Sequence, residues 1–475
     1  MVFSSIPFLF FFFPLFLILY YMVPFKSHNV KWKNVILLIF SLFFYAWGEP
    51  VYILLMLFST FLDYNCSRMM NRYQDKKKRK FFLFLSVIIN LGLLGFFKYS
   101  DFLISTINGL FHLQIPLLNL GLPIGISFYT FQTMSYTIDV YRRDVMPERN
   151  YFTYLTYVSM FPQLIAGPIV RYQTVSEELY KRDITYANFN SGLMRFIQGL
   201  FKKVLIANNI GFLWTTISET PMNELSVLTA WLGILAFAFQ IYFDFSAYSD
   251  MAIGMGRMLG FHYLENFNYP YISKSITEFW RRWHISLSTW FRDYVYIPLG
   301  GSRVKRIINI RNILIVWLLT GIWHGAAWNF VLWGLYFGIL LVIEKFFLKK
   351  YMEKWPSWAR HLYACFFILI GWLIFAFDDM SLLTSYAEKM FGIGSHGILD
   401  STFIFYLKNY FIVILVAVIF SIPTYPWIKE KLSHKKVYYS AFGFVLILLV
   451  YLLLLLVVIS YLVADSYNPF LYFRF

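Results

Sequence analysis

The sequence has 475 residues, of which 59% are hydrophobic and 14% charged, and its mean hydropathy is +0.59. A soluble domain carries about 25% charged residues, so this composition excludes an ordinary soluble protein and indicates an integral membrane protein. The net charge of +16 does not indicate a nucleic-acid-binding protein, because the basic residues cluster in short loops between apolar runs.

Apolar runs long enough to cross a bilayer recur along the chain. The first covers residues 6–23; no basic residue precedes it and no small-residue cleavage site follows, so we expect a retained first span rather than a signal peptide. The clearest run covers Val437 to Val463. Because a span in lipid must satisfy its own backbone hydrogen bonds, we expect helices.

The short basic loops predict the orientation of the chain, because an excess of Lys and Arg marks the cytoplasmic side. Their parity places both termini outside the cytoplasm, in a multi-pass protein of the plasma (inner) membrane. The basic rims also favour anionic lipids or an anionic cytoplasmic substrate. The basic loops are Lys26–Lys33, Lys76–Lys80, Arg142–Arg143, Lys345–Lys354 and Lys429–Lys436.

The middle of the chain, from Leu122 to Gly301, is repeatedly interrupted by Gly, Pro and charges. Broken backbone is tolerated at membrane depth where protein buries it or water lines it, so this region favours a cavity. Interfacial loops between short spans are the alternative.

A polar face is predicted on a helix over Phe239–Gly256, because polar residues recur there at helical spacing. Its two acids need partners, which Arg257 or Arg281 and Arg282 could supply. A bracing role is favoured for Asp250, whereas bracing and substrate contact both stay open for Gln240 and Asp244. The two strips are Gln240, Asp244 and Tyr248, and Tyr242, Ser246 and Asp250.

Two histidines each follow a tryptophan. His284 lies in Glu278–Arg303, a segment too polar to cross lipid alone, which we expect to be interfacial or re-entrant. Arg281, Arg282 and Arg303 of this segment either bind phosphates of a nucleotide-type donor or extend to the head groups.

His324 lies deep in an apolar stretch, Ile313 to Ile343, between Gly321 and Gly325. An ionisable group at this depth marks a functional site, and imidazole is the usual general base near neutral pH. The other six histidines lie in predicted loops or near span ends. We therefore predict that His324 is catalytic.

Several motifs resemble the membrane-bound O-acyltransferase family, in the branch typified by bacterial alginate O-acetyltransferases. The resemblance covers nearly the whole chain and is most specific where the two Trp-His pairs occur. The matching segments are Phe161–Arg171, Phe239–Ile253, Glu278–Ser302, Thr320–Trp333 and Asn468–Phe475.

The resemblance implies an all-α polytopic fold of about eleven transmembrane helices, with re-entrant helices around a central tunnel. The family's invariant histidine falls on His324 and its second histidine on His284. A cytoplasmic acyl thioester such as acetyl-CoA would be the donor substrate, with no permanently bound cofactor or metal. The expected reaction is O-acetylation of a cell-surface polysaccharide such as alginate.

The chemistry of O-acylation fits these residues. His324 can accept the hydroxyl proton, and His284 or the indole N–H of Trp323 can stabilise the oxyanion. We predict that the substrate or donor contacts come from Arg281, Arg282, Trp283, Trp323, Asn329, Gln240 and Asp244.

No segment resembles an extracytoplasmic domain that could hold a polysaccharide, so we expect a separate extracytoplasmic transferase as partner. The C-terminal aromatics are either a docking element or an aromatic belt at the membrane interface. Tyr472 is a further candidate for receiving the acyl group in transit. The tail residues in question are Tyr472, Phe473 and Phe475.

Neither cysteine, Cys66 or Cys365, has metal-ligand spacing, and both are expected to be buried inert thiols. Without repeats or linkers, we expect one transmembrane domain: N-terminal spans over 1–120, a catalytic core over 121–345, and C-terminal spans with the tail over 346–475.

Three other functions compete with this prediction. D-alanyl transfer to teichoic acid would use a carrier-protein thioester instead of acetyl-CoA. A transporter or flippase also has broken helices, although no inverted repeat is visible. A non-catalytic scaffold of a secretion complex is the third.

Overall fold

The computed structural model describes residues 1–24, 30–165, 167–433, 441–464 and 471, and over these ranges the chain is helical, without β-strands. The contacts divide it into two compact units: residues 1–196 with 249–265, and residues 197–248 with 266–475. Helices α9 (Tyr186–Phe201) and α11 (Val227–Leu259) each contribute residues to both units.

Seven helices in the described ranges are long and apolar enough to cross a membrane, which confirms the predicted class of all-α polytopic membrane protein. The expected total of about eleven spans stays a prediction. The seven are Val30–Gly48, Lys76–Phe111, Val227–Met258, Arg306–His324, Trp328–Met352, Ser357–Ala376 and Ser401–Ser421, and the shorter apolar helices are Phe8–Met22 and Leu448–Ala464.

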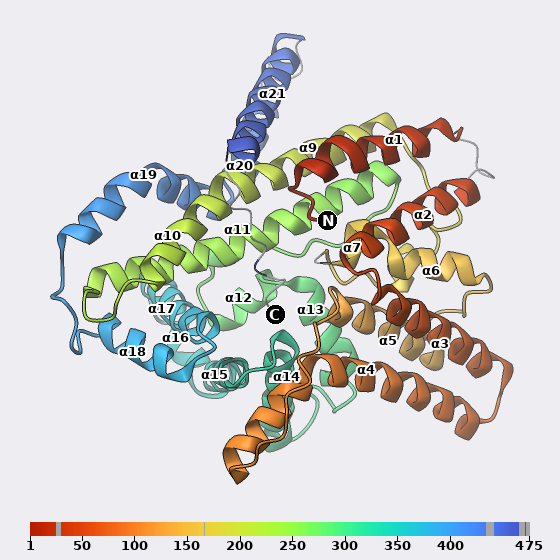
Figure 1. The fold of residues 1–475 in the computed structure, drawn as a ribbon, viewed down its shortest axis with the longest axis horizontal. Coiled ribbons are helices and arrows are strands. Elements are labelled where there is room, and N and C mark those ends of the chain that lie inside the picture. The colour runs from red at the N-terminus through yellow and green to blue at the C-terminus, as the bar shows by residue number, and fades with distance from the viewer. Residues whose placement is uncertain (25–29, 166, 434–440, 465–470, 472–475) are drawn as a thin grey trace. The chain divides into compact units, whose positions relative to one another are not determined.

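In the first unit α3, α4 and α5 lie side by side (Figure 1) and are joined by a buried polar network. The Asp63 carboxylate accepts hydrogen bonds from Ser86 Oγ at 2.6 Å and from Asn90 Nδ2 at 2.9 Å. Such internal bonds replace the water that lipid does not supply. The helices of this unit are η1 (Phe8–Phe12), α1 (Phe13–Met22), α2 (Val30–Gly48), α3 (Ile53–Arg72), α4 (Lys76–Phe111), α5 (Ile126–Arg142), α6 (Tyr151–Ser159), α7 (Phe161–Leu164), α8 (Tyr172–Val175) and the first part of α9.

The second unit combines long apolar helices with short, interrupted ones, as the glycines and charges of residues 266–301 predict. The short pieces are too brief to span a bilayer, which needs about 20 residues. Its helices are η3 (Lys202–Ala207), α10 (Asn208–Ser218), η4 (Pro270–Ile272), α12 (Ile276–Arg282), α13 (Ile285–Phe291), η5 (Arg292–Tyr296), α14 (Arg306–His324), α15 (Trp328–Ile343), η6 (Glu344–Leu348), α16 (Lys349–Met352), α17 (Ser357–Ala376), α18 (Met380–Met390), α19 (Ser401–Ser421), α20 (Thr424–Ser433) and α21 (Ala441–Ala464).

Helices α14 and α15 form a tight antiparallel hairpin (Figure 1) because glycines replace side chains where their backbones meet. A Cβ atom on Gly321 would lie 2.2 Å from the carbonyl oxygen of Phe330, and one on Gly334 would lie 2.4 Å from that of Trp317. This close approach fixes the end of α14, where His324 lies.

Candidate active site

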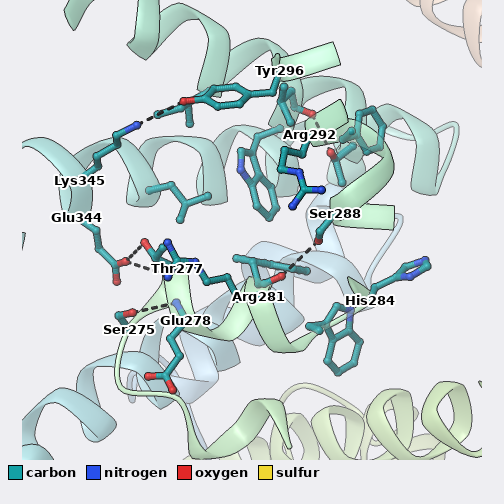
Figure 2. Close-up of a pocket in the computed structure, with 18 of the residues that line it drawn as sticks. Ser275, Thr277, Glu278, Arg281, His284, Ser288, Arg292, Tyr296, Glu344 and Lys345 are labelled. Atoms are coloured by element: carbon teal, nitrogen blue, oxygen red, sulfur yellow. Dashed lines mark hydrogen bonds between the residues drawn. The ribbon is translucent and has the colours of Figure 1, made fainter. Parts of the chain in front are cut away.

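One cavity in the second unit contains both Trp-His motifs. It encloses about 690 Å³, and its walls come from Lys274–Ser275, from helices α12 to α16, and from the start of α17. His284 and His324 both line it. In Figure 2, His284 lies on one side of the cavity and Glu344 and Lys345 lie on the opposite side. The fold therefore brings two motifs that are distant in sequence to one space.

The cavity is elongated along α14. Its lining includes one face of that helix, formed by Ile313, Val316, Trp317, Thr320 and His324. This face extends over eleven residues, about 16 Å at 1.5 Å per residue. Lys345 also lines the cavity, and its Nζ lies 2.7 Å from Oδ1 of Asn309. Because Asn309 precedes His324 by fifteen residues, the turn of α14 that Lys345 contacts lies about 22 Å from His324 along the helix axis.

His324 is the last residue of α14, whereas the sequence led us to expect it deep within a spanning helix. The apolar stretch from 313 to 343 is two helices, with a break at residues 325–327. The His324 ring lies among aromatic rings, with centroids 5.0 Å from Trp323, 5.0 Å from Trp333 and 5.5 Å from Phe375. The hairpin thus holds one polar ring inside an aromatic shell.

His284 precedes α13 with a φ of 43°, a left-handed conformation that is uncommon for a residue with a side chain. Its Nδ1 lies 3.1 Å from Oδ1 of Asn266, and the backbone N–H of Ser286 donates to the same atom at 3.2 Å. A backbone N–H can only donate, so this atom is an acceptor and the neutral imidazole must carry its proton on Nδ1.

The other nitrogen of His284, Nε2, is therefore a lone-pair acceptor in the neutral ring. It is buried and has no hydrogen-bond partner among the described residues. An orphaned acceptor beside a cavity is free to bind a substrate hydroxyl or its proton. The ring stacks edge-on against Phe245, with centroids 4.7 Å apart.

Tryptophans form a wall of the cavity. Trp280, Trp283 and Trp317 line it, and the Trp280 ring lies 5.4 Å from that of Trp333, which also contacts His324. The indole N–H of Trp280 is buried and donates no hydrogen bond within the described ranges. It is therefore a donor available to a bound substrate.

Positive charge is in excess on the cavity lining, which carries six basic and three acidic side chains. Of the acids, Glu278 pairs with Arg282 at 2.9 Å, and Glu344 accepts the backbone N–H groups of Ile276 and Thr277 at 2.6 and 2.8 Å. Four of the basic side chains form neither a salt bridge nor a side-chain hydrogen bond with the described residues, so they can bind an anion. These four are Lys274, Arg281, Lys349 and Arg360.

Only some of the residues that we predicted to contact the substrate or the acyl donor line this cavity. Arg281 and Trp283 line it. Arg282 is engaged by Glu278 and by the carbonyl of Asn268 at 3.1 Å. Asn329 is fully buried and donates to the carbonyl of Phe375 at 3.3 Å, so it braces α15 against α17. Trp323 lies between the histidines, with its centroid 6.0 Å from His284.

The acids of α11 find partners other than the predicted ones. Asp244 Oδ1 lies 2.6 Å from Lys203 Nζ, and the pair is almost fully buried. Asp250 pairs with Arg195 at 2.8 Å. The salt bridges of these acids thus come from η3 and α9, and not from Arg281 or Arg282, while Arg257 interacts electrostatically with Asp250.

Gln240, which also belongs to the polar face predicted on α11, packs against Gly211. A Cβ atom on Gly211 of α10 would lie 2.4 Å from its Nε2. Gln240 and Asp244 thus join helices of the second unit to one another.

The C-terminal aromatics Tyr472, Phe473 and Phe475 lie outside the described residues. Their described neighbour Leu471 is buried, and its backbone N–H donates to Asp244 Oδ2 at 2.8 Å. Asp244 therefore joins the C-terminal end of the chain to α11.

Several lining residues were not predicted from sequence. Lys274, Lys349 and Arg360 looked like ordinary basic residues at span ends, and Trp280 like one aromatic among many. Asn266, which fixes His284, carries no local signal. In the sequence, only the excess of basic residues near the ends of spans indicated that some of these lysines and arginines bind an anion.

Comparison with known proteins gives consistent matches. The family model of the membrane-bound O-acyltransferases matches residues 147–387. A probable alginate O-acetylase of Azotobacter vinelandii is 41% identical over 410 residues, 84% of this chain and 80% of that protein. A peptidoglycan O-acetyltransferase of Helicobacter pylori is 34% identical, covering 83% and 80%. A teichoic acid D-alanyltransferase of Bacillus subtilis is 28% identical, covering 53% and 68%.

These matches show that this helical membrane protein is an acyltransferase. The chain belongs to the membrane-bound O-acyltransferase family, as its sequence motifs predicted.

Proposed function

We propose that the protein is an O-acetyltransferase that takes an acetyl group from a cytoplasmic thioester, acetyl-CoA, for O-acetylation of a cell-surface polysaccharide such as alginate. The observation that carries this proposal is the single elongated cavity with both histidines and an excess of cations in its lining. The names and higher identities of the O-acetyl-transferring relatives favour acetyl over D-alanyl transfer.

The cavity matches a donor whose charged part lies far from its reactive carbonyl. Lys345 contacts Asn309, which is about 22 Å from His324 along α14, and Lys349 and Arg360 also line the cavity. Guanidinium and ammonium groups bind phosphates, so the anionic part of the donor would bind there. Its thioester would extend along α14 to the histidines.

The reaction then uses groups at the histidine end. His324 accepts the proton of the attacking hydroxyl while the new C–O bond forms at the thioester carbonyl. The Trp280 N–H donates to the oxyanion, and as the C–S bond breaks the departing thiolate receives the proton from His324. Neutral His284 cannot donate from Nε2, so its assigned role is to accept a hydrogen bond from the incoming hydroxyl.

An extracytoplasmic transferase is the proposed partner that carries the acetyl group to the polymer. The C-terminal segment with Tyr472, Phe473 and Phe475 is the proposed docking element. The bond from Leu471 to Asp244 supports this, because it ties the chain end to the unit that contains the cavity.

The experiment measures base-labile acetate on surface polymers of cells that lack the corresponding gene and express this chain or a variant. At equal protein level, His324→Ala should lower acetate by about a hundredfold or more, the contribution of a general base. His112→Ala, at the exposed end of α4, is the matched control and should retain activity.

The identity of the released group separates the alternatives. Ester-linked D-alanine in place of acetate would support the teichoic acid reaction, and acetate on peptidoglycan would replace alginate as the acceptor. Wild-type acetate with His324→Ala would reject the assigned base.

A further inference from the structure

The first unit contains a smaller basic pocket between the end of α3 and the loop that precedes α6. It encloses about 360 Å³ and is lined by Arg68, Met69, Asn71, Arg72, Met146, Pro147, Glu148 and Arg149. The charged residues of this lining are three arginines and one glutamate. The pocket belongs entirely to the first unit and shares no residue with the cavity that His284 and His324 line.

The glutamate forms no salt bridge with the arginines, because other donors engage its oxygens, and one carboxylate leaves the three guanidinium groups in excess. Glu148 is buried and accepts from the hydroxyls of Tyr172 at 2.7 Å and Tyr180 at 2.5 Å. It also accepts the backbone N–H groups of Arg149 at 2.6 Å and Asn150 at 2.8 Å. Three of these donors bind Oε1 and one binds Oε2, so both carboxylate oxygens are engaged. Arg68, Arg72 and Arg149 form no salt bridge to a described carboxylate.

The pocket is held in shape by hydrogen bonds to one carbonyl. The oxygen of Arg149 accepts from Tyr64 Oη at 2.6 Å and from Arg68 Nη1 at 3.0 Å. The loop is therefore fixed to α3 before any ligand arrives, while the side chains of Arg72 and Arg149 are exposed. A preformed backbone with one guanidinium already held in place lowers the entropy cost of binding an oxyanion.

The position of the pocket along the chain indicates its ligand. Helix α3 ends at Arg72, and α4 begins at Lys76 with five consecutive basic residues. Charges in this number require the water and head-group region, so the pocket lies at a bilayer surface. Met146, which is 79% exposed, adds an apolar surface beside the arginines. Phosphate next to hydrocarbon is the chemistry of a phospholipid.

We propose that this pocket binds the phosphate of an anionic phospholipid. In native mass spectrometry of the detergent-purified full chain, bound phosphatidylglycerol should survive better than phosphatidylcholine. The double variant Arg72→Ala/Arg149→Ala should lower the retained phosphatidylglycerol by about tenfold, since each guanidinium contributes charge-assisted bonds. Both side chains are exposed, so folding should persist, as an unchanged melting temperature would show.

The matched control is Lys76→Ala/Lys77→Ala, which removes two charges at the same membrane end but outside the pocket. It should retain phosphatidylglycerol at the wild-type level. An equal loss in both double variants would reduce the effect to general electrostatics and overturn the proposal. Displacement of the lipid by millimolar inorganic phosphate would also overturn it, because the pocket would then bind soluble phosphate.

Discussion

The hydrogen bond between His284 and Asn266 makes one imidazole nitrogen a donor and leaves the other as an acceptor. Nδ1–H donates to Asn266 Oδ1, and Nε2 is left as a buried acceptor beside the cavity. We therefore propose that Asn266 acts on the reaction through His284, as a positioning residue, because it selects the tautomer.

Asn266→Ala should lower acetyl transfer by about tenfold or more, because His284 can then turn or change tautomer. It should also destabilise the fold by about 1–3 kcal/mol, the cost of a buried unsatisfied donor. Transfer rate and thermal unfolding check both. Asn266→Asp keeps an acceptor oxygen and should restore most of the rate, whereas an equal loss in both variants would assign Asn266 to structure alone.

At the scale of elements, the α14–α15 hairpin decides where His324 lies. The helices meet at Gly321 and Gly334, whose added Cβ atoms would lie within 2.4 Å of backbone carbonyl oxygens. A break at residues 325–327 then lets the chain reverse beside Trp333. Backbone packing of small residues is the usual way for membrane helices to approach closely.

Gly321→Ala should force the two helices apart and destabilise the protein by about 1–3 kcal/mol or more, as overpacking does. Transfer should fall with it, since His324 is three residues away. Gly95→Ala is the control: this helical glycine of α4 has nothing within 4 Å of an added Cβ. That variant should be neutral or more stable, by up to about 1 kcal/mol. Equal melting temperatures for the two variants would contradict the hairpin argument.

At the scale of the whole molecule, the alternation of basic and neutral loops predicts the orientation. The segment from Ser381 to Asp400, which contains most of α18, carries two basic residues counting His396, whereas Lys76–Lys80 is entirely basic. By the positive-inside rule we expect the former to face outward and the latter to face the cytoplasm.

Cysteine labelling tests this orientation, because the chain has two cysteines, Cys66 and Cys365, and both can be replaced by serine. In that background, a membrane-impermeant maleimide added to spheroplasts should label Ser395→Cys and leave Lys78→Cys unlabelled until lysis. The reverse pattern would place the cation-rich cavity lining on the wrong side for a cytoplasmic donor.

The sequence alone predicts a helical membrane protein and singles out His284 and His324. It can do so because a lipid environment restricts each apolar segment by its own local composition. Runs of apolar residues must be helices, and a histidine or a basic cluster stands out wherever it interrupts them. The interrupted middle of the chain likewise favoured a cavity, and residues within 274–301 contribute to its lining.

The tertiary structure alone decided which residues share the cavity and which only brace the fold. Lys203 and Arg195 pair with the acids of α11, Asn266 sets the tautomer of His284, and Asn329 donates to the carbonyl of Phe375 in α17. These contacts join residues from separate elements. Inside a membrane protein polar groups bind whichever partner packing brings within reach, and sequence spacing does not encode that choice.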